Sequence, residues 1–311
     1  MEEYPRTLSE LERRFSTEEA CREYLRQLRW PNGYKCPRCG HAKGWLLDDE
    51  LFGCASCGYK TSVTAGTVFE RTRKPLVLWF RVAWWVTSQK NGASAKGLQR
   101  ALGFSSYETV WTWLHKLRRA MVRPDRDRLS GTVEVDEIFI GGEKPGKRGR
   151  GATGKVLVVI ATEVDGKRLG RIRMRRVVDA SAKSLQETVQ YAVEPGSHIR
   201  TDGWTGYKGL AVLGYRHTVV RSQAEVGQNL LPACHRVASL LKRWLTGTHQ
   251  GAVSHEHLDY YLDEYTFRFN RRTSRHRGKL FFRLLQNAMV TEGKTYEQII
   301  RGIRGLKKHN R

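Results

Sequence analysis

The sequence predicts an α/β chain of the α+β, multi-domain kind, and three observations support this. Four cysteines form two closely spaced pairs near the N-terminus, and a tryptophan-rich helical pattern follows them. From Gly131 to about residue 250, strands alternate with helices. At 311 residues the chain can hold two or three domains of ordinary size. The segment VRPDRDRLSG (122–131) combines proline, glycine and charge, so we expect the main domain boundary there.

The charge of the chain points to a polyanionic partner. The formal net charge is +24, from 55 Lys and Arg against 31 Asp and Glu, and such an imbalance is costly in self-repulsion. The basic residues are spread over the whole chain, which favours a long nucleic-acid footprint over a merely basic solvated surface. The longest apolar stretches, such as Val156 to Ala161, are far shorter than the roughly 20 residues of a membrane span. The charged N-terminus lacks an apolar export signal, so we expect a cytoplasmic chain with no membrane attachment.

Residues 1–30 are predicted to be an N-terminal helical segment. Apolar side chains recur at helical spacing across residues 8–29. Ser16 followed by Glu19 resembles a capping box, which would divide the segment into two helices.

The next segment, residues 31–70, is predicted to be a zinc ribbon. Cys21 and Cys234 are isolated, and the other four cysteines follow the pattern C-x2-C-x14-C-x2-C, as Cys36, Cys39, Cys54 and Cys57. Four thiolates complete a tetrahedral Zn²⁺ site, and a closed site of this kind is structural. Gly40 and Gly58 follow the pairs and suit the tight turns that aim N–H groups at the sulfurs. Such dense packing favours cytosolic metal binding over a secreted disulfide framework. A reduced thiol cluster or a redox CxxC pair is the alternative.

Residues 71–125 are predicted to form a helix-turn-helix DNA-binding region. An apolar helix is followed by a short helix, a turn at Gly103 and a longer helix, with Ser94 and either Ser105 or Ser106 as N-caps. A basic final helix of this shape can enter a major groove, and its candidate contacts are Lys116, Arg118 and Arg119. The alternative is a plain helical spacer. The tryptophans of this region are expected to form a core instead of stacking on bases.

Chemistry is expected in residues 126–275. GTVEVDEIFIGG places Asp136 within an apolar strand, and two further strands continue an antiparallel meander. After the helix AKSLQETVQYAV, Asp202 ends a later strand at a glycine. This is the layout of an RNase H-like catalytic domain, a mixed sheet flanked by helices, in which the two carboxylates meet across neighbouring strands and hold divalent metal. A carboxylate in an apolar strand is costly unless it is paired or metal-bound. The alternative partner is one of the many arginines.

The chain resembles the insertion-sequence transposases of the zinc-ribbon, DDE type that are related to the Merlin elements. The resemblance covers nearly the whole chain and rests on CPRCG with CASCG, AGTVFERTRKPLVLWF, VEVDEIFIGGEKPGKRGRG, IRTDGWTGY, LLKRWLTGTHQG and HLDYYLDEYTFRFNRR. It implies that Asp136 and Asp202 are the first two metal ligands of a catalytic triad.

The third ligand departs from the commonest family pattern. Many relatives have Glu or Asn seven residues before the lysine of the LLKR phrase, here Lys242, whereas this chain has His235. Some family members resemble this chain in placing His there. Seven residues turn a helix by about 700°, so both side chains share one face, and Lys242 would contact a phosphate. An imidazole favours softer ions, so Mn²⁺ is expected to support activity better than Mg²⁺. The rival third ligand is Glu264, and Glu137 is a spare carboxylate on the opposite side of the strand from Asp136. The alternative is that His235 is a surface histidine and that Glu264 forms a salt bridge with Arg268.

Two further basic stretches are predicted to hold DNA, the loop GGEKPGKRGRGATGK and the segment FRFNRRTSRHRGK. The tail, residues 276–311, is predicted to be basic and helical. Outside the helix-turn-helix, the candidate DNA contacts are Lys144, Lys147, Arg148, Arg150, Lys242, Arg243, Arg268, Arg271, Arg272 and Arg275. Six or more phosphate contacts would make binding steeply dependent on salt.

Together these features predict a DNA transposase. It would bind the terminal inverted repeats of a mobile element, cleave the DNA ends and transfer the 3′ ends to target DNA with two Mg²⁺ or Mn²⁺ ions. A dimer or larger assembly on double-stranded DNA, associated with the nucleoid, is expected because two ends must be joined. The sequence has no Gly-x4-Gly-Lys-Ser/Thr loop, so no nucleotide cofactor is expected. The alternatives are an inactive, transposase-derived DNA-binding regulator and an RNase H-like nuclease for branched DNA.

Overall fold

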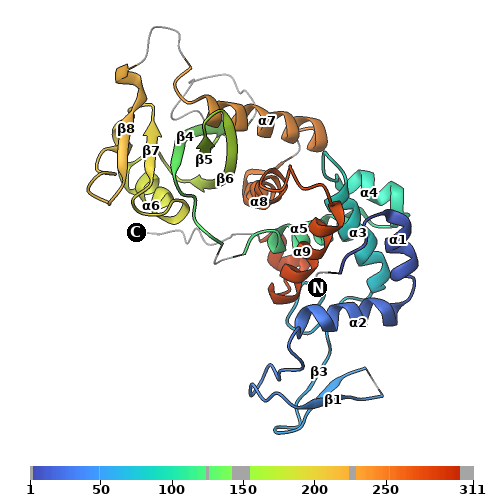
Figure 1. Cartoon of the computed structure of the whole chain (residues 1–311). Coiled ribbons are helices and arrows are strands. Elements are labelled where there is room, and N and C mark those ends of the chain that lie inside the picture. The colour runs from blue at the N-terminus through green and yellow to red at the C-terminus, as the bar shows by residue number, and fades with distance from the viewer. Residues whose placement is uncertain are drawn as a thin grey trace. The chain divides into compact units, whose positions relative to one another are not determined.

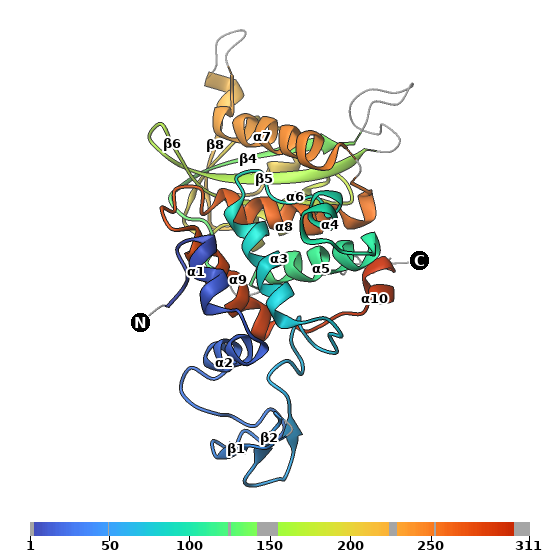
Figure 2. The same cartoon turned by 90° about the vertical axis from the view of Figure 1, so that its right-hand side faces the viewer.

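The computed structural model describes residues 3–48, 50–123, 126–141, 155–223, 229–251 and 253–301 (Figures 1 and 2). Across these residues the chain forms two compact units. Of the described residues, those from 3 to 123 and from 273 to 301 form unit 1, and those from 126 to 272 form unit 2. Within the described ranges, no helix combines the length and the apolar character that crossing a membrane requires.

Unit 1 begins with two helices, α1 (Leu8–Arg14) and α2 (Glu18–Arg29), as the sequence allowed. The cap lies one residue later than predicted. Thr17 has an extended backbone, and its side chain accepts a hydrogen bond from the N–H of Ala20 at 3.2 Å. The Ser16 hydroxyl donates to the carbonyl of Arg13 instead. Thr17 therefore separates the two helices, because its hydroxyl binds an N–H group that the first turn of α2 leaves unpaired.

The ribbon follows as three short strands, β1 (Gly44–Leu46), β2 (Phe52–Cys54) and β3 (Lys60–Thr61). Within the described residues they form an antiparallel sheet in the order β1-β2-β3. So small a sheet buries little apolar surface, and its stability depends on the cysteine cluster described below.

The rest of unit 1 is helical and is built around aromatic side chains. Its helices are α3 (Leu76–Ser88), α4 (Ala95–Leu102), α5 (Tyr107–Ala120), α9 (Arg277–Val290) and α10 (Tyr296–Ile300). Trp79 stacks on Trp113 with ring centroids 3.7 Å apart, and both are buried. The C-terminal helix α9 packs against α2, α3 and α5, bringing Phe281 against Phe80 and Trp84. The prediction that the tryptophans form a core is confirmed for these three.

The α4–α5 pair has the predicted turn. Ser94 caps α4, Gly103 ends it in the left-handed conformation with φ 69°, and Ser106 caps α5. Most of α5 is buried, and its exposed end is the N-terminal one, where Tyr107 is 47% exposed.

Unit 2 is a mixed sheet with helices on both faces (Figures 1 and 2). Its strands are β4 (Thr132–Ile140), β5 (Val156–Asp165), β6 (Arg168–Val177), β7 (His198–Thr201) and β8 (Arg216–Val219). Within the described residues the order is β6-β5-β4-β7-β8. The first three strands form the predicted antiparallel meander, and β7 and β8 continue the sheet in parallel. This arrangement confirms the predicted fold class.

Side chains alternate between the two faces of the sheet along each strand, and different helices cover the two faces. Val133 and Val135 of β4 pack with α6 (Ala182–Ala192). Ile138 packs on the other face with α7 (Pro232–His249) and α8 (Leu258–Phe269). Because side chains alternate across a strand, Glu134 and Asp136 lie on the face of Ile138, the face covered by α7. Short 3₁₀ turns complete the unit at Thr205–Tyr207, Val220–Gln223 and His255–His257.

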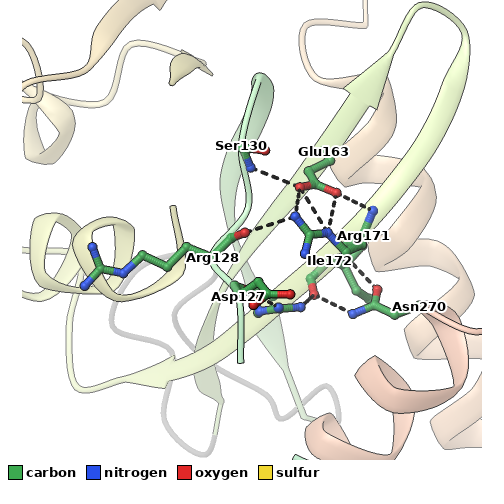
Figure 3. A network of polar contacts seen from close by, with 8 residues as sticks. Asp127, Arg128, Ser130, Glu163, Arg171, Ile172 and Asn270 are labelled. Atoms are coloured by element: carbon green, nitrogen blue, oxygen red, sulfur yellow. Dashed lines mark hydrogen bonds and ion pairs between the residues drawn. The ribbon is translucent and has the colours of Figure 1, made fainter. Parts of the chain in front are cut away.

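A polar network secures the edge of the sheet (Figure 3). The amide of Asn270, at the end of α8, accepts from the N–H of Ile172 at 2.7 Å and donates to its carbonyl at 3.1 Å, as a neighbouring strand would. The Glu163 carboxylate accepts from the N–H groups of Ser130 and Arg171, each at 3.0 Å. The network therefore covers the exposed edge strand β6 and fixes the chain where it enters β4.

Candidate metal centres and nucleic-acid surface

The four predicted cysteine ligands converge on one point in the ribbon. The sulfurs of Cys36 and Cys57 lie 3.8 Å apart, and those of Cys39 and Cys54 lie 3.6 Å apart. All four sulfurs lie within 4.8 Å of one another, and none is in a disulfide. Among the described residues, this is the one group of three or more ligating side chains gathered so tightly. Four thiols at this spacing fit a tetrahedral zinc ion.

Each cysteine pair sits in the same tight turn. The N–H of Gly40 donates to the carbonyl of Cys36 at 2.9 Å, and the N–H of Gly58 donates to that of Cys54 at 3.1 Å. Both glycines have positive φ, 76° and 65°, which explains why glycine follows each pair. The N–H of Cys57 lowers the pKa of the Cys54 thiol, which favours the thiolate that binds metal.

In unit 2, the structure brings Asp136 and Asp202 to the same level of the sheet. Asp136 lies within β4, and Asp202 directly follows β7. The two strands pair in parallel, with Glu134 opposite Arg200. Continued two residues further, this register would bring Asp136 level with Asp202, whose carboxylate adds to the raised pKa of Asp136.

His235 reaches the same place from α7. Its Nε2 lies 3.3 Å from Oδ2 of Asp136, and its side chain is 49% exposed while that of Asp136 is 13% exposed. Lys242 lies on the same helix and is exposed. His235 is therefore the more exposed partner of this contact, and Asp136 is the more buried one.

The electrostatics of this site favour a bound cation. Burial raises the pKa of Asp136 to about 6, and the carboxylates of Glu137 and Asp202 add to the shift, against the opposing effect of His235. Asp136 is buried and lies near other carboxylates, so a divalent ion bound to it would relieve their repulsion. The oxygen and imidazole donors present fit Mg²⁺ or Mn²⁺. Glu137 itself points to the other side of β4, as predicted, where the Tyr207 hydroxyl donates to its Oε2 at 2.9 Å.

The turn after β7 holds Asp202 in place. Its Oδ1 accepts from the N–H of Trp204 at 2.9 Å. Gly203 between them has φ 95°, and a Cβ there would lie 2.7 Å from Cγ1 of Val219. Glycine is required for both reasons, so the DGW phrase of the sequence encodes a fixed orientation of the carboxylate.

The rival ligand, Glu264, lies in the interior of unit 2. Its side chain is fully buried on α8, and Nε of Arg268 donates to its Oε1 at 3.3 Å. Arg268 is itself 11% exposed. The charged neighbours that shift the pKa of Asp136 are Glu137, Asp202 and His235 instead.

The burial of Glu264 predicts that Glu264→Ala destabilises the protein. Removing one partner of a buried ion pair takes the opposite charge away from the other, at a cost of about 3–5 kcal/mol. Chemical denaturation of purified protein would measure the loss. Glu264→Gln keeps an oxygen for Arg268 and is expected to lose less than half as much. Equal stability of Glu264→Ala and wild type would contradict this role.

Sequence reasoning missed Glu134, which is 1% exposed on β4. The signal that could have revealed it is its position two residues before Asp136, on the same face of the strand. Its contacts are described below.

The basic residues predicted to contact DNA differ in how far their side chains are exposed. Arg118 is only 2% exposed, so its side chain lies inside unit 1. Burial lowers the pKa of Lys116, and Arg119 donates to the carbonyl of Glu292. Arg118 therefore does not offer its charge to DNA at the surface of unit 1. Lys144, Lys147, Arg148 and Arg150 lie outside the described residues.

Several arginines at and after the end of α8 pack against the protein itself. The guanidinium groups of Arg271 and Arg272 each lie 4.1 Å from the ring centroids of Phe267 and Phe269, respectively. Arg268 pairs with Glu264 as described. The exposed members of the predicted set are Lys242, Arg243, Arg272 and Arg275.

A four-cysteine ribbon followed by a mixed sheet with two carboxylates on neighbouring strands defines a zinc-ribbon protein with an RNase H-like domain. Residues 128–270 match the ISXO2-like transposase domain, and residues 16–60 match the transposase zinc-ribbon domain. The chain is also 28% identical over 292 residues to an uncharacterized protein in transposable element ISH50 of Halobacterium salinarum, covering 85% of this chain and 94% of that one. The chain belongs to the insertion-sequence transposases that carry an N-terminal zinc ribbon.

Proposed function

We propose that this transposase binds the terminal inverted repeats of its element, cleaves the DNA ends and joins the 3′ ends to target DNA. The observation that carries the proposal is the contact of His235 with Asp136 at 3.3 Å, with Asp202 close enough to shift the pKa of Asp136. Asp136 carries a pKa raised to about 6, because it is buried beside other acidic groups. Such a concentration of acidic charge marks a functional site.

In this proposal, Asp136, Asp202 and His235 hold the divalent ions, with Mn²⁺ supporting activity better than Mg²⁺. When bound, two ions activate the attacking oxygen and stabilise the leaving oxygen of an in-line displacement at phosphorus. The half-exposed ring of His235 faces the open side of the site, and Lys242 offers a positive charge to a phosphate along the same face of α7. Hydrolysis at the element end and attack by the freed 3′-OH then use one set of side chains.

DNA recognition is assigned to unit 1 and to the exposed basic residues. The ribbon and the α4–α5 helix-turn-helix would read the ends, with the exposed N-terminal end of α5 as the part that approaches a groove. Lys242, Arg243, Arg272 and Arg275 would contact phosphates, which makes binding steeply salt-dependent. We also propose a dimer or larger assembly on paired ends in the cytoplasm, near the nucleoid.

The proposal is tested with labelled double-stranded DNA that carries the element's own ends, incubated in Mn²⁺ and in Mg²⁺. Wild type, Asp202→Ala, His235→Ala and Glu264→Gln are compared at equal folded concentration. Glutamine is used at position 264 because alanine would break the buried ion pair and lower the stability of the protein. We expect cleavage by wild type and Glu264→Gln, and a loss of at least about 100-fold in the other two.

Two results would redirect the assignment. Loss of cleavage in Glu264→Gln with cleavage kept in His235→Ala would make Glu264 the third ligand. Tight binding of the ends by wild type without cleavage in either metal would favour a DNA-binding regulator, and cleavage of branched DNA alone would favour a structure-selective nuclease.

A further inference from the structure

The first turn of α7 is held by a carboxylate from the sheet. Oε2 of Glu134 accepts hydrogen bonds from the N–H groups of Ala233 at 2.8 Å and Cys234 at 3.1 Å. The residue at the N-cap position, Leu231, has an apolar side chain that cannot accept them. Pro232 fills the first helical position, where no N–H is needed. A buried glutamate on β4 therefore takes the place of an N-cap residue.

Glu134 also ties this helix and β7 to its own strand. The thiol of Cys234 donates to the backbone carbonyl of Glu134 at 3.3 Å. On the other side, Nη1 of Arg200 lies 3.4 Å from Oε1 of Glu134, and the two residues pair in register across β4 and β7. One residue therefore contacts all three elements that position Asp136, Asp202 and His235.

The distances along the chain are short at each contact. Asp136 is two residues beyond Glu134 on the same face of β4, and Asp202 is two residues beyond Arg200. His235 directly follows Cys234, whose N–H and thiol both bind Glu134. A shift in any of these contacts moves a site side chain with little intervening backbone to absorb it.

The chemistry of Glu134 suits a positioning role. It is 1% exposed, and its carboxylate oxygens face two helix N–H groups and a guanidinium. A carboxylate at a helix N-terminus is stabilised by the helix dipole and makes strong, charge-assisted hydrogen bonds. Both of its oxygens are engaged by these donors.

We propose that Glu134 is a positioning residue that locks the first turn of α7 to β4 and β7, and so fixes His235 against Asp136. The inference rests on the proposed function for its effect on cleavage, and its effect on α7 can be measured without any activity.

The first test measures backbone hydrogen exchange in the full-length protein by mass spectrometry. Glu134→Ala is expected to speed exchange in the peptide containing Ala233 and Cys234 at least tenfold, and Glu134→Gln much less, because the glutamine oxygen can still accept. Glu163→Ala is the matched control: Glu163 also binds two backbone N–H groups, those of Ser130 and Arg171, and neither belongs to α7. Unchanged exchange in Glu134→Ala, or equal acceleration in Glu163→Ala, would overturn the proposal.

The second test measures cleavage rate at saturating DNA. We expect Glu134→Ala to lower the rate at least 30-fold with DNA affinity unchanged, Glu134→Gln to recover most of it, and Glu163→Ala to match wild type at a temperature where all are folded. These fold-changes follow from misplacement of a site group.

A double-mutant comparison shows whether Glu134 acts through His235. When Glu134→Ala is added to His235→Ala, the cleavage rate should fall by less than about threefold further. The effects of residues that act as a unit do not add. Fully multiplicative losses would overturn the proposal. If wild type fails to cleave, the proposed function fails, and the exchange experiment still decides whether Glu134 holds α7.

Discussion

Asp136→Asn is expected to lower cleavage of the element ends by roughly 10³-fold or more while leaving the protein folded. The change keeps the shape of the side chain and removes the charge that, in the proposed site, holds metal against Asp202 and His235. Cleavage of end-containing DNA in Mn²⁺ measures the loss.

Stability should move in the opposite direction from activity. Because burial and acidic neighbours raise the pKa of Asp136 to about 6, its ionised form at neutral pH is disfavoured in the folded chain. When the folded-state pKa of a carboxyl lies above its unfolded-state pKa, the ionised group destabilises the fold, and this cost is complete above the folded-state pKa. A neutral asparagine removes the cost, so Asp136→Asn should raise the Tm in the absence of divalent metal.

The control is Asp165→Asn, at the exposed end of β5, which should change neither cleavage nor Tm. Full cleavage by Asp136→Asn would remove Asp136 from the catalytic assignment. A lowered Tm would show that the fold depends on the carboxylate in some other way.

Removing zinc is expected to unfold the ribbon and leave the rest of the protein folded. Structural zinc contributes an apparent binding free energy of about 10–16 kcal/mol in small zinc domains, and the three short strands of this ribbon have little core of their own. Cys39→Ser should therefore abolish zinc binding and recognition of the element ends. Zinc content per chain and binding to end-containing DNA measure the two losses.

The matched control is Cys21→Ala, which also removes one thiol from unit 1. Cys21 is fully buried in α2, and burial raises its pKa to about 12, so it is an inert core thiol outside the cluster. This variant should keep its zinc. Loss of zinc there, or retention of zinc in Cys39→Ser, would contradict the ligand assignment.

Local patterns were readable in advance, and the structure bears out several of them. The cysteine spacing and its two glycines specify the cluster because each pair and its turn span only a few residues. The caps at Ser94 and Ser106 and the turn at Gly103 likewise depend on neighbours in the chain. The sequence did not identify Thr17 as a cap, since Ser16 beside it offers the same hydroxyl chemistry.

Contacts between distant segments could not be read in this way. Glu264 and His235 are both polar residues at helical positions, and spacing left open a metal-ligand role or, for Glu264, a salt bridge with Arg268. Packing shows Glu264 paired with Arg268 in the interior and His235 beside Asp136. Arg118 follows the basic pattern of a DNA-facing helix and is nevertheless buried, because α5 is covered along most of its length. The return of α9 to unit 1 also depends on aromatic contacts across the whole chain.

The sequence by itself therefore determined the fold class and the cysteine cluster, and it placed Asp136 within one strand and Asp202 at the end of a later one. Residue type and spacing are enough when ligands lie in one turn or at the ends of regular strands. The tertiary structure alone decided that His235 lies 3.3 Å from Asp136 and that Glu134 fastens the first turn of α7. A buried carboxylate can accept N–H groups from a helix about a hundred residues away only once the sheet has formed.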